Sequence, residues 1–229
     1  MCSPPVSCIM PTCNRRRFVP QAIKYFLEQD YPHKELIIVD DGRDAVADLV
    51  PPDSCIRYFA LPKKLSTGAK RNFAIERSNA GIILHWDDDD WQARHRIRYQ
   101  VEPLLASNAE ICGIQQMLFF DLRARQLWRY EYPASPRRWL AGGALCYKKS
   151  FWQNHRFEDV SIGEDTRFVW KQRAAKAAIL PDYKFYVAMI HPHNTSPKSL
   201  SPPYWKRWHE DLPALLQDDW AFYSALGKF

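Results

Sequence analysis

Four consecutive aspartates, Asp87-Asp88-Asp89-Asp90, are the chemical feature of the chain that most needs an explanation. They follow an apolar run that ends in Trp86, and Trp91 comes directly after them. Two carboxylates about 4 Å apart repel each other by about 4 kcal/mol at an effective dielectric constant of about 20. A solvated surface loop would weaken this repulsion, and a bound divalent cation would cancel it. We favour the cation, because the flanking tryptophans keep the acidic block from spreading into water.

The ligand type indicates which cation this would be. Carboxylate oxygens favour a hard ion such as Mn²⁺ or Mg²⁺, which in proteins binds one or two carboxylates together with substrate phosphates. Side chains alternate along an extended segment, so Asp87 and Asp89 would point to the same side. We therefore predict that these two carboxylates face the cation and that a diphosphate completes the site.

Two further acidic pairs lie where a ligand could reach them. Asp40-Asp41 follow the apolar run at 36–39, and Glu164-Asp165 follow Gly163. In an open α/β sheet, ligands bind beyond the carboxyl ends of the strands, which is where Asp40-Asp41 and the four aspartates would meet. Glu164-Asp165 would lie apart from the metal. They could act as a general base or stabilise a helix N-terminus, and the two roles are compatible.

The elements that must position these residues alternate in type over the first half of the chain. Apolar runs predict strands at 6–10, 36–39, 56–59 and 82–84, and helical periodicity predicts helices at 16–29 and 67–77. We expect the first strand to end at Pro11. Strands separated by helix-length segments imply right-handed crossovers and a mostly parallel sheet, and hence an open α/β fold.

The second half of the chain has a different pattern. Residues 117–120 and 126–132 predict an antiparallel pair, 144–147 a further short strand, and 204–226 an amphipathic tail. We expect both halves to share one sheet. Gly142-Gly143 would either admit a substrate close to the backbone or mark a simple turn. Trp91, Trp139 and Trp152 would either stack on a sugar ring or pack in the core.

Composition narrows the class of protein. With 229 residues, 46% of them hydrophobic and 25% charged, the chain suits a globular fold with a proper core. The six cysteines include no Cys-x-x-Cys pair, and no apolar stretch approaches the roughly 18 residues of a membrane span. We therefore expect a cytoplasmic protein with reduced thiols. The net charge of +6 comes without a concentrated Lys/Arg stripe, so we expect no nucleic-acid partner. Trp205-Lys206-Arg207-Trp208 could contact a membrane surface peripherally.

Five segments, in order between about residues 5 and 170, resemble the motifs of family 2 glycosyltransferases. They are Val6 to Asn14 (opening strand and turn), Glu35 to Gly42 (second-strand motif), Lys70-Arg71-Asn72 (helix motif), Asp87 to Asp90 (Asp-x-Asp metal motif) and Gly163-Glu164-Asp165 (acidic motif with the catalytic base). The resemblance implies the GT-A fold. That fold is a Rossmann-like α/β/α sandwich with a mostly parallel central sheet and, here, a small antiparallel element in the C-terminal half.

The resemblance also divides the chain and assigns roles. It implies a single domain over 1–229, with a nucleotide-sugar-binding half at 1–110, an acceptor and catalytic half at 111–203 and a helical tail at 204–229. The implied nucleotide and donor contacts are Pro11, Thr12, Asn14, Asp40, Asp41, Lys70, Arg71, Asp87 and Asp88. The implied metal ligands are Asp87, Asp89 and His191, although a single histidine is more often a surface residue or a hydrogen-bonded one. Asp165 is the implied catalytic base, with Glu164 beside it.

The implied activity is transfer of one sugar from a nucleoside-diphosphate sugar to an acceptor hydroxyl, with inversion at the anomeric carbon. A UDP-sugar is the expected donor, and Mn²⁺ or Mg²⁺ the expected cofactor. A carboxylate opposite the departing diphosphate would take the proton of the acceptor hydroxyl. Two alternatives remain open: a non-catalytic module that binds nucleotide sugar or carbohydrate, and a metal-dependent nuclease.

Overall fold

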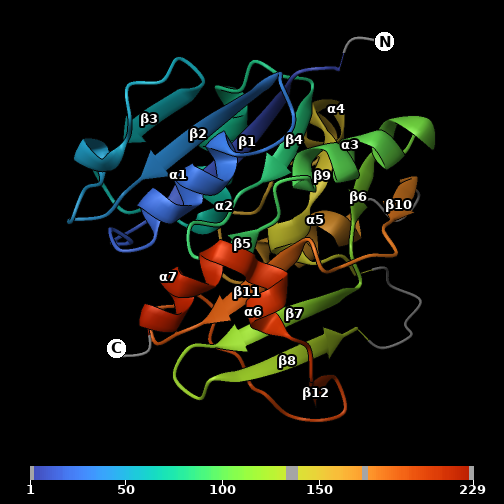
Figure 1. Ribbon diagram of the computed structural model, residues 1–229. Coiled ribbons are helices and arrows are strands. Elements are labelled where there is room, and N and C mark those ends of the chain that lie inside the picture. The colour runs from blue at the N-terminus through green and yellow to red at the C-terminus, as the bar shows by residue number, and fades with distance from the viewer. Residues whose placement is uncertain (1–2, 133–138, 172–174, 227–229) are drawn as a thin grey trace.

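The computed structural model describes residues 3–132, 139–171 and 175–226, which form two β-sheets with helices packed around them (Figure 1). Within these residues, the larger sheet has seven strands in the order β10-β6-β9-β4-β1-β2-β3. Its strands are β1 (Val6–Thr12), β2 (Lys34–Asp40), β3 (Ile56–Ala60), β4 (Ile82–His85), β6 (Ile111–Gly113), β9 (Cys146–Lys148) and β10 (Ala177–Ile179).

The larger sheet is mostly parallel. Only β9 runs antiparallel to its neighbours, β4 and β6, among the strands that the structure describes in this sheet. The apolar runs of β1, β2 and β4 are buried, as is expected of strands at the centre of a parallel sheet. The predicted α/β class with a mostly parallel central sheet is thereby confirmed.

Helices cover both faces of this sheet (Figure 1). On one face, α1 (Val19–Leu27) and α3 (Arg96–Ala106) share a core with Cys8 and Leu84. On the other face, α2 (Thr67–Glu76), α4 (Lys149–Asn154) and α5 (Glu164–Lys171) share a core with Ile9. Because side chains alternate along a strand, β1 supplies both cores. The layers are those of the predicted α/β/α sandwich.

A second sheet has the strand order β12-β8-β7-β11-β5 in the described residues. It comprises β5 (Trp91–Gln92), β7 (Gln116–Asp121), β8 (Gln126–Glu131), β11 (Tyr186–Ile190) and β12 (Trp205–Arg207). The predicted antiparallel pair is confirmed as β7 and β8. The expectation that both halves share one sheet is confirmed for the larger sheet, to which the C-terminal half contributes β6, β9 and β10. The second sheet was not expected: β7 pairs with β8 and β11 and does not extend the larger sheet.

The C-terminal segment is part strand and part helix. It begins with β12 and continues with α6 (Leu212–Leu216) and α7 (Trp220–Ala225), so the predicted helical tail was wrong at its start. Trp205 packs on Phe119, and Trp208 lies under the Arg129 guanidinium, so both indoles rest on the second sheet. Among the described helices, none combines the length and the apolar character that a bilayer crossing requires.

Strand β1 continues through Pro11, although we expected it to end there. The carbonyl of Ile9 accepts a hydrogen bond from the backbone N–H of Trp86, so Pro11, two residues later, faces the same side of the strand. Pairing with β4 has already ended at Ile9 and His85. A proline without an N–H therefore breaks no ladder hydrogen bond at this position.

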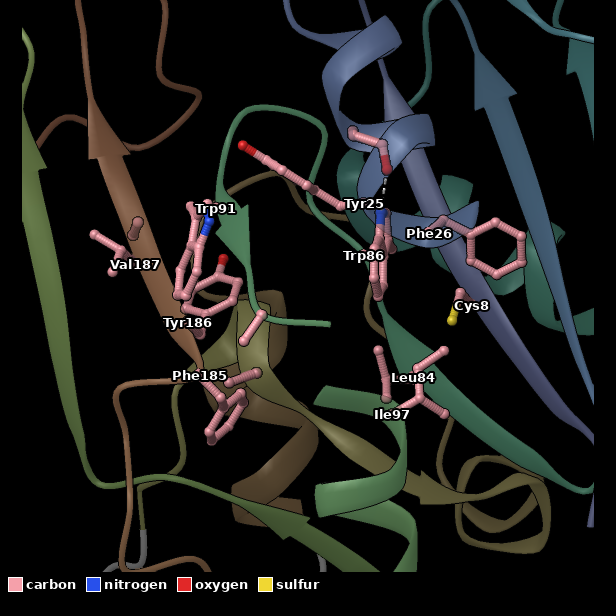
Figure 2. Packing of buried hydrophobic residues seen from close by; sticks show 14 of the residues in the cluster. Cys8, Tyr25, Phe26, Leu84, Trp86, Trp91, Ile97, Phe185, Tyr186 and Val187 are labelled. Carbon is pink, nitrogen blue, oxygen red and sulfur yellow. Dashed lines mark hydrogen bonds between the residues drawn. The ribbon is translucent and has the colours of Figure 1, made fainter. Parts of the chain in front are cut away.

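Trp86 anchors the end of β4 in the core beneath α1 (Figure 2). Its indole N–H donates to the carbonyl of Ala22 over 3.0 Å, and its ring meets Phe26 edge-on with 5.9 Å between centroids. Because Trp86 directly precedes Asp87, this packing fixes the point at which the four aspartates leave the sheet.

We expect Leu84→Ala to lower the free energy of unfolding by about 2–5 kcal/mol, because it removes buried methyl groups and leaves a cavity. Leu105→Ala is the matched control, since Leu105 is 44% exposed near the end of α3, and it should change stability by no more than about 0.5 kcal/mol. Urea unfolding monitored by circular dichroism measures both. Equal effects of the two substitutions would contradict the burial of Leu84.

Candidate active site

A cavity of about 970 Å³ opens at the carboxyl ends of β1 and β4, between the two sheets. Most of the residues that we predicted for the site line it: Pro11, Thr12, Asn14, Lys70, Arg71, Asp87, Asp88, Asp89, Glu164 and Asp165. Asp40, Asp41 and His191 are not part of this lining. The structure therefore brings motifs from both halves of the chain to one cavity.

The four aspartates have four different environments. Asp87 is the most open, with its side chain 26% exposed and the Arg71 guanidinium 3.4 Å away. Asp88 and Asp89 lie 3.8 and 3.6 Å from the guanidinium of Arg15. Asp90 is buried and accepts hydrogen bonds from the hydroxyl of Tyr186 and, over 2.7 Å, from the backbone N–H of Met189. Asp90 therefore ties the acidic segment to β11.

These environments separate the pKa values of the four carboxyl groups. Burial, followed by the charge of Asp89, raises the pKa of Asp88 to about 7. Burial also raises the pKa of Asp87, and that of Asp90 well above its ordinary range. Burial acts on Asp89 too, but the hydrogen bond from His191 and the charge of Arg15 outweigh it and lower the pKa of this carboxyl. Asp89 is thus the member of the block that most readily carries a negative charge.

His191 is buried directly behind Asp89, with 2.9 Å between Nε2 and the Asp89 Oδ2 atom. Its ring stacks on Phe18 at 4.8 Å between centroids. Nδ1 accepts the backbone N–H of His193, so in the neutral imidazole Nε2 carries the proton and donates it to Asp89. In this arrangement His191 orients Asp89. To bind a cation through Nε2, the imidazole would have to carry its proton on Nδ1 and give up the hydrogen bond from His193. Ligation by His191 stays a prediction.

The residues around Asp89 suit a divalent cation that also binds a ligand. In the part of the chain that the structure describes, no three His, Cys, Asp or Glu side chains gather closely enough to hold a metal alone. Mn²⁺ and Mg²⁺ typically take one or two carboxylates and complete their shell with substrate phosphate and water. Asp89, with Asp87 on the same cavity wall, offers such an incomplete set.

Arg71 links the acidic block to the second acidic pair. Its Nη1 atom lies 2.5 Å from Glu164 Oε1, and its Nη2 atom lies 3.4 Å from Asp87 Oδ1. Both groups of the Arg71–Glu164 pair are buried, and α2 and α5 supply them from facing helices. Glu164 and Asp165 begin α5, so they also stand in its first turn as the helix-terminus alternative expected.

Two adjacent glycines, Gly142 and Gly143, let two carboxylates of the cavity approach the backbone closely. A Cβ added at Gly142 would overlap the carboxylate of Asp165, and one added at Gly143 would overlap Asp87 and the hydroxyl of Tyr186. The alternative of a turn is confirmed, because Gly142–Ala144 form a 3-10 turn, and protein carboxylates lie against its backbone. The substrate role that we considered for these glycines remains untested.

Buried hydrogen bonds from His85 and Arg96 hold the backbone carbonyls of these two glycines. Burial lowers the pKa of His85 well below its ordinary range, so the imidazole is neutral. Its Nδ1–H donates to the Gly142 carbonyl over 2.7 Å. The buried Arg96 guanidinium donates to the carbonyls of Gly143 and His85 over 2.7 and 2.8 Å. These hydrogen bonds fix the backbone on which Asp87 and Asp165 rest.

Asp41 and Lys70 form a buried pair beside the cavity. Lys70 Nζ donates to Asp41 Oδ1 over 2.8 Å and to the Thr12 carbonyl over 2.9 Å, and the Asp41 side chain is fully buried. Asp40 accepts hydrogen bonds from the backbone N–H groups of Gly42 and Val46. These contacts shape the loops around the cavity, and direct donor contacts by the three side chains stay predictions.

Several residues of the site were missed in the sequence. Arg15 and Tyr186 contact the aspartates, and Asn194 Nδ2 lies 3.4 Å from Asp89. No motif marks Tyr186, because its place beside Asp87 depends on pairing between β11 and β5. Of the three tryptophans considered for sugar stacking, Trp91 and Trp152 are buried in the core. Trp139 lines the cavity.

Gly143→Ala should destabilise the protein by about 1–3 kcal/mol, because the new methyl group must displace the buried Tyr186 and Asp87. Gly81→Ala serves as the control, since a Cβ there meets nothing within 4 Å, and it should stay within about 0.5 kcal/mol of the parent chain. Thermal unfolding by calorimetry compares the two. If Gly143→Ala is as stable as Gly81→Ala, the side chains of Tyr186 and Asp87 can move aside without a cost in stability.

Comparison with known proteins places this geometry in a family. The model of the family described as glycosyl transferase family 2 matches residues 7–165. An uncharacterized glycosyltransferase of Haemophilus influenzae is 28% identical over 129 residues, which are 54% of this chain and 51% of that protein. The chain thus matches about half the length of that relative.

Two solved structures share the fold. S. aureus TarS in complex with UDP-GlcNAc superposes with a TM-score of 0.69 at 18% identity, over 86% of this chain and 62% of that one. The mannosyltransferase PcManGT from Pyrobaculum calidifontis, in complex with GDP-Man and Mn²⁺, gives a TM-score of 0.62 at 20% identity, over 82% and 56% of the two chains. The GT-A fold is therefore confirmed. Because the family match runs from β1 to the Glu164-Asp165 pair and covers well over half of the sequence, the chain belongs to glycosyl transferase family 2.

Proposed function

We propose that this protein transfers one sugar from a nucleoside-diphosphate sugar to an acceptor hydroxyl, with inversion and with the help of Mn²⁺ or Mg²⁺. The observation that carries the proposal is the pair of glycines at 142 and 143. Their backbone brings the carboxylates of Asp165 and Asp87 to neighbouring points of one cavity. A base and a donor-side carboxylate are thus held at fixed positions relative to each other before any substrate arrives.

The cationic side chains of the cavity suit a departing diphosphate. Negative charge develops on the diphosphate as the bond from the anomeric carbon to its oxygen breaks, and preorganised cations stabilise that charge. Arg71 and Arg15 both line the cavity. A divalent cation held by Asp89 and Asp87 would add Lewis-acid stabilisation of the same oxygens.

Asp165 is the side chain best suited to take the proton of the acceptor hydroxyl. Glu164 is already committed to Arg71, whereas Asp165 accepts one backbone N–H, that of Thr166, at Oδ1 and turns Oδ2 toward Gly142. As the hydroxyl oxygen bonds to the anomeric carbon, its proton passes to Asp165 and the diphosphate leaves from the opposite side. Such a displacement inverts the anomeric carbon.

The donor and location belong to the same proposal. UDP-GlcNAc is bound by TarS, which shares this fold, and this supports a UDP-sugar as donor. The described cysteines, Cys8, Cys13, Cys55, Cys112 and Cys146, are free thiols, which supports the cytoplasm as the location. A chain that bound the donor but released no UDP would instead be the non-catalytic module.

Asp165→Asn should keep the fold and donor affinity and lose about 10²-fold or more of turnover, because the amide cannot accept the proton. Donor hydrolysis by the parent chain, followed as UDP release from UDP-sugars with Mn²⁺, provides the assay. Asp218→Asn, at an exposed position, is the isosteric control and should turn over normally. Normal turnover by Asp165→Asn would remove this residue from the mechanism.

Asp89→Asn should weaken Mn²⁺-dependent binding of UDP by about 10-fold or more, because it removes the carboxylate with the lowest pKa of the block. Isothermal titration with UDP, in Mn²⁺ and in EDTA, measures the difference, with Asp218→Asn again as control. A metal-dependent gain in affinity that Asp89→Asn leaves intact would exclude Asp89 as a ligand.

A further inference from the structure

One face of the second sheet forms the floor of the cavity. Side chains alternate along each strand, and in the observed register Ala188 of β11 lies beside Phe119 of β7, while Met117 lies beside Tyr130 of β8. Trp205 of β12 continues the same row beyond Tyr130. All five side chains line the cavity. The floor therefore extends from β11, where Tyr186 hydrogen-bonds Asp87, to the far edge of the sheet.

The outer part of this floor consists of aromatic rings. Tyr130 lies 4.9 Å from Trp205 and 5.1 Å from Trp139 between ring centroids, with interplanar angles of 54° and 65°. We call these three residues the aromatic platform. All three are partly exposed and line the cavity, in contrast to the buried Trp91 and Trp152. Core packing alone would not leave three large rings facing an open cavity.

The aromatic platform lies beside the proposed base. Trp139 precedes Gly142 by three residues, and Gly142 packs against the carboxylate of Asp165. The segment 161–166, which carries Asp165, lines the same cavity. A molecule lying on the platform would thus have one end near the proton acceptor. Arg15 and Asp89, which we propose to face the diphosphate and the cation, lie 3.6 Å apart in the same cavity.

The chemistry of this region suits a sugar ring. A pyranose has an apolar C–H face, which packs on aromatic rings, and hydroxyl groups around its edge, which need polar partners. Thr195, Ser196 and Ser199 line the cavity next to the platform, and Lys198 Nζ lies 5.7 Å from the Phe119 ring centroid. A purely aliphatic chain would leave these polar groups without partners.

We infer that the aromatic platform binds a pyranose ring of the acceptor, so that the acceptor of this enzyme is itself a carbohydrate. The inference rests on the proposed function, because it names the substrate that brings the hydroxyl to Asp165. Stacking on the platform positions that hydroxyl, and the polar side chains beside the platform select among sugars by their hydroxyl pattern.

The test uses 5-fluorotryptophan in the full chain and ¹⁹F NMR, with saturating UDP and Mn²⁺. Trp139→Phe, Trp205→Phe and Trp220→Phe assign the three resonances. The probes are the methyl pyranosides of glucose, galactose, mannose and N-acetylglucosamine. At least one of these glycosides should shift both the Trp139 and the Trp205 resonance, and the two shifts should saturate with the same dissociation constant. Trp220 packs on Phe120, whose side chain points to the other face of β7, and its resonance should stay in place.

Variants then measure the contribution of the rings. Tyr130→Leu and Trp139→Leu should each raise the dissociation constant of the responding glycoside by about tenfold, the loss expected for removing an aromatic contact of about 1.4 kcal/mol. Trp220→Leu should leave it unchanged. If one platform variant fails to fold, the other still measures the contact.

The outcomes separate this inference from the proposed function. Resonances of Trp139 and Trp205 that respond to none of the glycosides overturn the inference, and so does an equal response of Trp220. UDP release from UDP-sugars by the parent chain is measured in the same samples. If UDP is released but the Trp139 and Trp205 resonances respond to no glycoside, only the assignment of the acceptor is overturned. If the chain neither binds nor releases UDP, the proposed function itself is overturned.

Discussion

The confinement of four carboxylates between two sheets is the constraint on which the rest of this structure depends. The acidic segment starts at the buried Trp86 and ends at the buried Trp91, so it cannot move away into solvent. Each carboxyl group therefore needs its own compensation. The charge of Arg71 compensates that of Asp87, and the charge of Arg15 compensates those of Asp88 and Asp89. Asp90 accepts hydrogen bonds from two residues of β11. The raised pKa values of three of the four indicate that compensation by the protein is incomplete. A cation with a bound diphosphate would complete it.

The two glycines convert this local constraint into the geometry on which the proposed mechanism depends. Side chains at 142 and 143 would push Asp165 and Asp87 away from the backbone. The buried His85 and Arg96 hold the glycine carbonyls, so the distance between the two carboxylates is set by the core and not by flexible loops. Preorganisation of this kind is what a group transfer requires, because the base and the leaving group must act on one carbon from opposite sides.

The second sheet supplies a part of the cavity that the sequence motifs did not predict. The larger sheet and its helices supply the proposed donor side, where the family motifs lie. Strands β7, β8 and β12 supply an aromatic floor that the motifs did not predict. The two sheets meet at β5, a strand of two residues directly after Asp90. A displacement of the four aspartates would therefore disturb the pairing between β5 and β11. Through the hydrogen bond of Tyr186 it would also move the floor of the cavity.

Local pattern in the sequence was sufficient for the α/β class, the mostly parallel sheet and the order of the early elements, and the resemblance to family motifs pointed to part of the cavity lining. Those features depend on apolar periodicity within short segments and on motifs that follow strands directly, as Asp87 follows β4. Tertiary pairing alone decided the second sheet, the place of Tyr186 and Arg15 beside the aspartates, the burial of Asp40 and Asp41, and the contact between Gly142 and Asp165. Residues that meet across more than 20 positions leave no mark on local spacing, and Tyr186 and Asp87 are 99 positions apart in the sequence. The physical reason is that charge compensation and close approach depend on distances in space, and the chain order does not contain those distances.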